Sequence, residues 1–400
     1  MKKIAIITLV VILAIFAFFY VQIQKLETKV TAKLVQHETT FQEFNIGVFP
    51  QPYLAFESVK HNQISIEKLT GKFPLSAMFF GDVKLQEVDI QNVKLSENAQ
   101  NSANIQMRFS DFSLDNITPD NIALSGDSQI VVELAKPLYG NNRIFNFRFI
   151  KGGIERSNER KLAAYFDHVV LNEEKVGFVK TELDLSQYTK HLTADIDSGC
   201  LPNLPCTAHL DYVSEPEQSA VAFSAKNYPI ERLLTWLTFP KTITGSADVE
   251  IAVQFAHSQI INGEFFFDAK NGELLGLNLL DLAGQYLPIN WNDAELKEKV
   301  SLNTKYDQAT SLFRLNGHQL DIEKMSLKTT ALSGEGTGVV DLQSMQCNVD
   351  LNLHPTDEKY AEFTLPIRFF DSCYSPQYEV QFDKNLRSKI KDLIKRKLKQ

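Results

Sequence analysis

The sequence of 400 residues lacks the short motifs that mark most catalytic sites. It contains no G-x-S-x-G nucleophile elbow, no H-E-x-x-H zinc motif and no P-loop that ends in Gly-Lys-Ser/Thr. The eight histidines are scattered, and acidic pairs such as Asp248 and Glu250 fall on the polar side of an alternating run, where solvation accounts for them. We therefore predict a protein without catalytic residues, metal or cofactor, which binds rather than catalyses.

Cysteine is scarce, with four in the chain. Cys200 and Cys206 stand at the ends of the proline-stiffened stretch "SGCLPNLPC", which predicts a disulfide, with two buried free thiols as the alternative. Cys347 and Cys373 are then left to form a second pair. No histidine or further cysteine pair lies at zinc-binding spacing beside them, which disfavours a metal site.

Long apolar runs are absent except at the start of the chain, where Ile4–Val21 follows Lys2 and Lys3. This run would form a helix of about 27 Å, close to the thickness of the hydrocarbon core of a bilayer. A cleaved signal peptide is the alternative, but the run ends in aromatic residues instead of a small-residue cleavage site. The lysines predict a cytoplasmic end over residues 1–3 and a single-pass anchor over 4–21, with the bulk of the chain across the membrane.

Charge of one sign is concentrated in the tail. The chain has a formal net charge of −8, but Lys384–Gln400 holds eight Lys or Arg and one Asp (+7), which leaves −15 for the rest. The acidic body argues against a nucleic-acid partner. On a helical wheel the tail has an apolar stripe and a basic remainder, which predicts an amphipathic helix on an anionic membrane surface, a surface helix packed on the sheet, or a contact with an acidic protein face. The residues assigned to the membrane-surface hypothesis are Lys384, Arg387, Lys389, Ile390, Lys391, Leu393, Ile394, Lys395, Arg396 and Lys397.

Helical signals are few between about residues 60 and 383, where period-two alternation predicts strands. The clearest runs are "SADVEIAVQF" and "QCNVDLNL". Asn262-Gly263 and Asn271-Gly272 are hairpin dipeptides, so we expect consecutive strands to pair in an antiparallel order. Two short helices are expected in "NYPIERLLTWL" and "LNLLDLAGQYL".

The glycine-rich stretch "LSGEGTGVVDL", residues 332–342, resembles a phosphate-binding loop at first sight. A dinucleotide site needs a helix after the glycines, whereas two valines and a second alternating run follow here. We interpret the glycines as bends that allow a strand to form, and not as a phosphate-binding loop.

Tryptophan is rare, with 2 residues against 28 Phe, and the strands carry an aromatic and aliphatic face that has to be buried. A second sheet, a sheet closed on itself, or a curled sheet that holds an apolar ligand would each bury it. The predicted fold is thus mainly β, a long antiparallel, twisted or curled sheet with few short helices. The candidate groove residues, which a closed core would equally explain, are Val249, Ile251, Val253, Phe255, Val349, Leu351 and Leu353.

Several elements occur in an order that resembles the C-terminal region of the AsmA family of Gram-negative envelope proteins. They are "LTFPKTITGSADVEIAVQF", "INGEFFFDAKNGELLGLNLLDL", the run from "NTKYDQATSLFRLNG" to "LSGEGTGVVDLQSMQCNVDLNL", and "LPIRFFDSCYSPQYEVQFD". On this basis residues 221–383 are expected to form an AsmA-like β region, preceded by a β-rich region over 22–220 and followed by the basic helix over 384–400.

The resemblance implies a bacterial inner-membrane anchor, a periplasmic β-rich groove, and a role in phospholipid movement or outer-membrane assembly. It implies no enzyme. The expected partners are phospholipid, the inner membrane and another envelope protein at the C-terminal end. The alternative function is a non-enzymatic scaffold or regulator of outer-membrane protein assembly.

Overall fold

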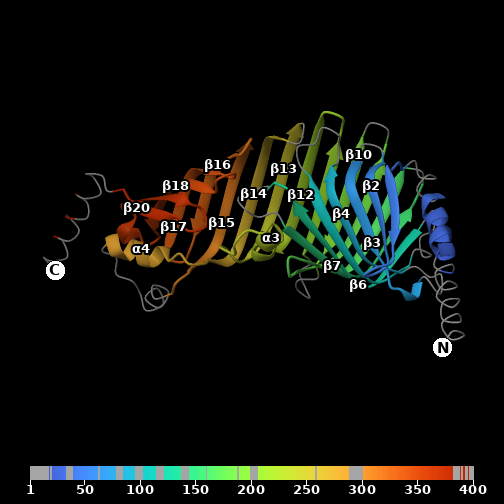
Figure 1. Ribbon diagram of the computed structural model, residues 1–400. Coiled ribbons are helices and arrows are strands. Elements are labelled where there is room, and N and C mark those ends of the chain that lie inside the picture. The colour runs from blue at the N-terminus through green and yellow to red at the C-terminus, as the bar shows by residue number, and fades with distance from the viewer. Residues whose placement is uncertain are drawn as a thin grey trace, which may run out of the picture. The chain divides into compact units, whose positions relative to one another are not determined.

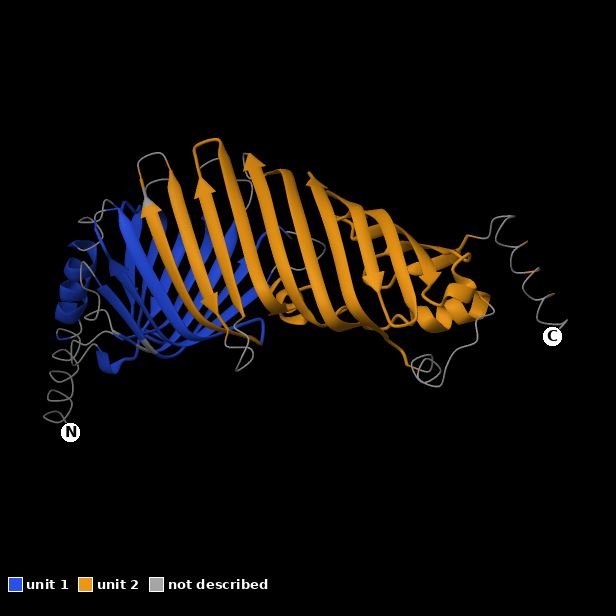
Figure 2. Ribbon diagram, turned by 180° about the vertical axis from the view of Figure 1, so that it is seen from behind, with its two compact units in different colours: residues 1–136, 143–173 blue, residues 137–142, 174–400 orange. Residues whose placement is uncertain are grey.

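The computed structural model describes residues 18, 20–32, 39–61, 64–77, 84–94, 102–113, 121–136, 144–158, 160–186, 189–198, 206–256, 259–287, 301–381, 388, 391 and 395. These residues form twenty strands and a few short helices, so the mainly β expectation is confirmed (Figure 1). The chain divides into two compact units, residues 1–136 with 143–173 and residues 137–142 with 174–400 (Figure 2).

Unit 1 is an antiparallel meander in which every strand from β1 to β8 pairs with the next along the chain. Successive side chains of a strand point to opposite faces, so the alternation in the sequence produces one apolar face and one polar face. The strands are β1 (Glu43–Gly47), β2 (Tyr53–His61), β3 (Ile64–Lys72), β4 (Lys84–Lys94), β5 (Ala103–Ser113), β6 (Asn121–Leu134), β7 (Ile144–Arg156) and β8 (Lys161–Leu171).

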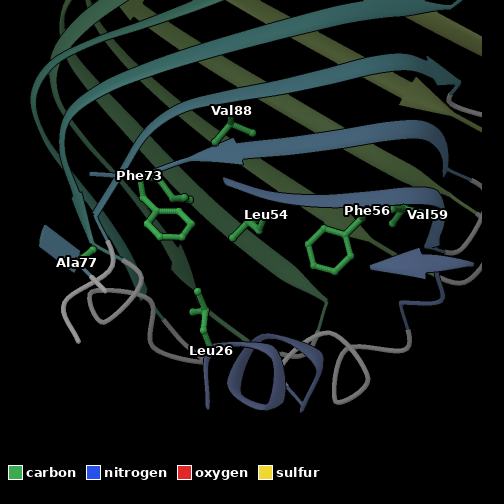
Figure 3. Packing of buried hydrophobic residues seen from close by; sticks show 8 residues of the cluster. Leu26, Leu54, Phe56, Val59, Phe73, Ala77 and Val88 are labelled. Atoms are coloured by element: carbon green, nitrogen blue, oxygen red, sulfur yellow. The ribbon is translucent and has the colours of Figure 1, made fainter. Parts of the chain in front are cut away.

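A helix over residues 20–32 covers part of the apolar face of unit 1. Leu26 on this helix packs in one buried cluster with Leu54, Phe56 and Phe73, as Figure 3 shows. Phe56 also stacks on Phe44, with ring centroids 4.3 Å apart. One part of the core of unit 1 therefore lies between this helix and strands β1 to β4, and a second part on β7 and β8 includes Phe149 and Val169, which are 1% and 0% exposed.

Unit 2 continues the same pattern, with antiparallel pairing of each neighbour from β9 to β20. Its strands are β9 (Glu174–Leu185), β10 (Lys190–Asp197), β11 (Thr207–Ser214), β12 (Gln218–Pro229), β13 (Ser246–Ala256), β14 (Gln259–Leu274), β15 (Thr304–Asn316), β16 (Gln319–Lys328), β17 (Leu332–Asp341), β18 (Gln346–Pro355), β19 (Leu365–Ser372) and β20 (Gln377–Val380). The antiparallel expectation is confirmed here too.

The predicted short helices exist where the sequence places them. Helix α3 (Ile230–Trp236) connects β12 to β13, and helix α4 (Leu279–Tyr286) follows β14. A turn of 3-10 helix, η2 (Glu358–Tyr360), lies between β18 and β19. All three occur in connections at the same edge of the unit 2 sheet, and Figure 1 shows α3 and α4 along its lower side.

The two hairpin dipeptides were wrong predictions, because β14 runs straight through both. Asn271 has a positive φ of +52°, which asparagine tolerates. It forms no pair with β15, but Lys270 and Gly272 on either side of it pair with Gln308 and Tyr306 in the same register. Gly272 is needed for a close approach, since a Cβ there would lie 2.4 Å from the hydroxyl of Tyr306. The Asn-Gly pair thus forms a strand irregularity instead of a turn.

The predicted membrane anchor lies outside the described residues, except for residues 18, 20 and 21. Within the described part of the chain, no helix has both the length and the hydropathy to span a bilayer. Of the basic tail, Ser388, Lys391 and Lys395 are described, each helical and exposed. Its apolar stripe lies outside the described residues.

Candidate functional site

The most extensive candidate surface is the apolar face of unit 2, where strand pairing aligns side chains into rows. One row, which we call the outer row, crosses all strands from β9 to β20 through directly paired positions. Its members are Thr181, Ala194, Leu210, Phe223, Ile251, Phe265, Phe313, Ile322, Gly338, Val349, Phe369 and Tyr378. Apart from Thr181 and the phenol of Tyr378, the row presents only apolar side chains or glycine.

A parallel row, the middle row, lies two residues from the outer row on each strand except β16, where a register shift makes the step three residues. It consists of Val179, Ile196, Ala208, Ala225, Val249, Phe267, Ser311, Met325, Gly336, Leu351, Ile367 and Val380. Its single polar side chain, Ser311, is buried and donates a hydrogen bond to the carbonyl oxygen of Lys324 at 3.1 Å. The rows therefore form a continuous apolar surface across unit 2.

Burial differs between the rows of this surface. A third row, the edge row, lies on the side of α3 and α4 and is buried, with exposures of 0% for Tyr228, Ala269 and Leu353. Its members are Tyr228, Ala247, Ala269, Ala309, Leu327, Gly334, Leu353 and Leu365. The middle row is mixed: Val249 is 9% exposed and Leu351 5%, while Phe267 is half-buried.

In the outer row most large side chains are half-buried, while Ile322 is buried and Tyr378 is exposed. The half-buried members are Leu210, Phe223, Ile251, Phe265, Phe313, Val349 and Phe369. The face is thus packed along the edge beside α3 and α4, and most large side chains of the outer row remain partly accessible. Beyond that row Val253 and Leu315 are again buried, at 8% and 3% exposed.

Two tyrosines hold the packed edge together through their hydroxyl groups. The hydroxyl of Tyr228 hydrogen-bonds to that of Ser198, which also donates to the carbonyl oxygen of Val176. Tyr306 donates to the carbonyl oxygen of Thr244, between α3 and β13. Burial is the main reason why the pKa of each of these phenols rises to about 12. Both are therefore neutral hydrogen-bonding groups at physiological pH.

Helix α4 is fixed by polar contacts at its first turn. Asn278 caps it, because its side-chain oxygen accepts a hydrogen bond from the backbone N–H of Asp281 at 2.8 Å. The hydroxyl of Thr304, at the start of β15, accepts from the N–H of Leu279 at 2.8 Å and donates to the carbonyl oxygen of Leu277. These bonds leave the apolar side of α4 facing the sheet, with Leu279, Leu280, Leu282 and Ala283 buried.

The glycine-rich stretch is strand β17, so its interpretation as part of a sheet is confirmed. The whole stretch from Leu332 to Asp341 is extended, which corrects the expectation that its glycines would act as separate bends before the strand. Gly334, Gly336 and Gly338 lie in the edge, middle and outer rows. A Cβ on Gly336 would lie 2.6 Å from the carbonyl oxygen of Asp350, so these glycines permit close approach of the neighbouring strand.

The predicted groove residues share one face, but they differ in accessibility. Ile251, Phe255 and Val349 are half-buried, whereas Val249, Val253 and Leu351 are buried between their neighbours. Leu353 does not fit the groove assignment, because it is 0% exposed in the edge row, paired with the equally buried Leu365. Sequence reasoning missed the outer-row phenylalanines Phe223, Phe265, Phe313 and Phe369, although the same period-two signal was present in each strand.

The predicted cysteine pairs have different outcomes. Cys206 is buried, but Cys200 lies outside the described residues, so that disulfide stays a prediction. Cys347 and Cys373 are free thiols, both half-buried. Among the described residues, no group of three His, Cys, Asp or Glu side chains is arranged to hold a metal ion.

Comparison with known proteins gives one full-length relative and one distant one. An uncharacterised protein of Haemophilus influenzae is 38% identical over 399 residues, which is 100% of both chains. The protein AsmA of Escherichia coli is 22% identical over 328 residues, 74% of this chain and 50% of AsmA. No family model matches the chain, and no solved structure does. The relation to AsmA is distant, whereas the chain belongs to the same family as the Haemophilus influenzae protein.

Proposed function

We propose that this chain is a lipid-handling protein of the bacterial envelope, in which the outer row of unit 2 accommodates phospholipid acyl chains. The observation that carries the proposal is the outer row itself, an apolar strip that passes through every strand of unit 2 while most of its large side chains remain half-buried. Folding leaves part of this apolar surface accessible, and a bound acyl chain would remove it from water.

The energetics favour such a ligand. Each methylene group transferred from water to an apolar surface contributes about 0.8 kcal/mol. The neighbouring positions on β13 and β18, Glu250 and Asp350, point to the opposite face and are exposed, so the two faces differ strongly in polarity. An uncharged acyl chain would therefore bind the apolar face in preference to the polar face. We also propose that the protein binds lipid without catalysing a reaction.

We further propose the location that such a role requires. The apolar run over residues 4–21 would anchor the chain in the inner membrane, with the bulk in the periplasm. The basic tail over 384–400 would contact anionic lipid or another envelope protein. The distant similarity to AsmA supports this assignment.

Photocrosslinking in intact cells tests the proposal. A photoreactive amino acid at Ile251 or Val349 is expected to yield lipid adducts that mass spectrometry identifies by their mass. The same amino acid at Glu250 or Asp350, the adjacent residues on the polar face, provides the matched control. Equal lipid labelling from both faces, or none from Ile251 and Val349, would disprove the groove.

The scaffold alternative has its own supporting observation on the polar face. Phe266 is 40% exposed there and borders a shallow depression of about 430 Å³ that includes Ala222, Ser224, Glu250 and Ala252. An exposed aromatic ring beside small residues suits a protein contact. Protein crosslinks from Phe266, without lipid adducts from the apolar face, would favour this function over lipid handling.

A further inference from the structure

The register of the last strands brings two free cysteines together. Cys347 on β18 lies directly opposite Asp371 of β19. The backbone N–H of Cys373 donates to the carbonyl oxygen of Met345 at 2.8 Å, which extends the pairing beyond the end of β19. These two pairings place Cys347 and Cys373 at diagonal positions where the β18–β19 ladder ends.

The two thiols also interact. They lie close enough for the Cys347 thiol to affect the ionisation of Cys373, and both are half-buried at the edge of the sheet opposite α3 and α4. Burial, and then the Cys347 thiol, raise the pKa of the Cys373 thiol to about 12. Redox-catalytic cysteine pairs depend on a lowered thiol pKa, which stabilises their reduced form. The environment of Cys373 is the opposite and suits a structural bond.

We propose that Cys347 and Cys373 form a disulfide that fastens β18 to the end of β19. The oxidant is a second disulfide, either a small one such as oxidised glutathione or that of a dithiol oxidoreductase. The Cys347 thiolate attacks this donor and displaces one donor thiolate. The Cys373 sulfur, losing its proton, then attacks the Cys347 sulfur of the mixed disulfide and displaces the second. Two protein thiols are oxidised, one donor disulfide is reduced to two thiols, and the two protons pass to the donor thiolates.

The bond would stabilise the C-terminal end of unit 2. Strand β20 has four residues and pairs with β19 on one side. The cross-link closes the loop from residue 347 to residue 373, which contains η2 and all of β19, and so restricts the unfolded chain. This inference does not depend on lipid binding, because it requires only the pairing of the last strands and an oxidising environment.

Peptide mapping of the full-length protein can assign the bond without ambiguity. Cleavage after Lys and Arg places Cys347 in residues 329–359 and Cys373 in residues 369–384, whereas Cys200 and Cys206 share residues 191–226. Protein equilibrated with oxidised glutathione, then alkylated and digested, is expected to give the joined 329–359 and 369–384 peptides. Dithiothreitol should separate them. Recovery of both peptides in alkylated form, of glutathione adducts alone, or of links to residues 191–226 would overturn the proposal.

Thermal unfolding provides the second measurement. In the oxidised protein, Cys347→Ala should lower the Tm of unit 2 by roughly 5–10 °C relative to the unsubstituted chain. Under reducing conditions most of this difference in Tm should disappear, because neither protein then contains the bond. Val349→Ala, on the same strand and face, is the matched control and should shift the Tm equally in both redox states. A Cys347→Ala shift that is also independent of redox state would show that the thiols remain unbonded.

Discussion

The two units have the same strand pattern but bury their apolar faces differently. In unit 1 the covering helix, residues 20–32, precedes the first strand and reaches the middle of β2, where Leu54 and Phe56 are 5% and 3% exposed. In unit 2 the covering helices are connections between strands. Helix α3 has 7 residues and α4 has 8, so each is about 10–12 Å long.

The length of a connection limits what it can cover. Strand β13, with 11 residues, extends over roughly 35 Å, about three times the length of α3. A helix inserted between strand ends therefore packs over one edge of the sheet, and outer-row side chains such as Ile251 and Phe313 remain half-buried. A covering helix from outside the meander has no such limit. The helix of unit 1 thus packs on the middle of β2, whereas α3 and α4 pack along one edge of the unit 2 sheet.

The strongest test of this difference places a charge on each face. Leu54→Asp would bury an unpaired carboxylate in unit 1 and should cost more than about 4 kcal/mol, enough to unfold that unit. Ile251→Asp lies on the half-buried outer row, where the charge remains hydrated, and should cost about 1–2 kcal/mol. Hydrogen exchange resolved by peptide reports each unit separately. Similar loss of protection in both units would mean that the outer row is a closed core.

Truncation of one phenylalanine in each unit gives a milder form of the same comparison. Phe56→Ala should reduce the free energy of unfolding of unit 1 by about 3–5 kcal/mol, because it removes a buried ring from a packed cluster. Phe313→Ala should cost unit 2 only about 1–2 kcal/mol, since the ring is half-buried beside Phe267. Urea unfolding followed by hydrogen exchange measures both. An equal cost would contradict the open face.

The packed edge of unit 2 should be sensitive to alkaline pH. The pKa values of Tyr228 and Tyr306, raised from 10.0 to about 12, mean that the fold favours the neutral phenols. Their stabilisation is fully present below about pH 10 and is lost as the pH rises towards 12, up to about 2 kcal/mol for each. The Tm of unit 2 measured between pH 9 and 12 should fall less steeply in Tyr228→Phe and Tyr306→Phe. An unchanged slope in both variants would contradict this assignment.

The sequence predicted the strand pattern because period two is a local property of each strand. Val249, Ile251 and Val253 alternate with Glu250 in the sequence and lie on one face in the structure, as expected. Reasoning from local sequence failed at Asn271-Gly272, because a positive φ occurs in strand irregularities as well as in turns. Only the pairing of Gly272 with Tyr306 on β15 shows that the strand continues here.

Accessibility could not be predicted in the same way. Leu353 and Val349 stand four residues apart on the same face of β18, and the sequence treats them alike. Their difference arises from the elements at each edge of the sheet, which depend on how β12 to β19 are connected and aligned. The candidate face was thus predictable from the alternation, but its open part was not.

A last comparison separates these two positions. Leu353→Ala removes a fully buried side chain and should cost about 2–4 kcal/mol, whereas Val349→Ala should cost less than about 1 kcal/mol. If acyl chains occupy the outer row, Val349→Ala should also reduce lipid adducts from a photoreactive residue at Ile251, because it removes contact area from the bound chain. Asp350→Ala, on the polar face, should leave those adducts unchanged. A large loss of stability in Val349→Ala would place it in a closed core and remove the physical basis for a groove.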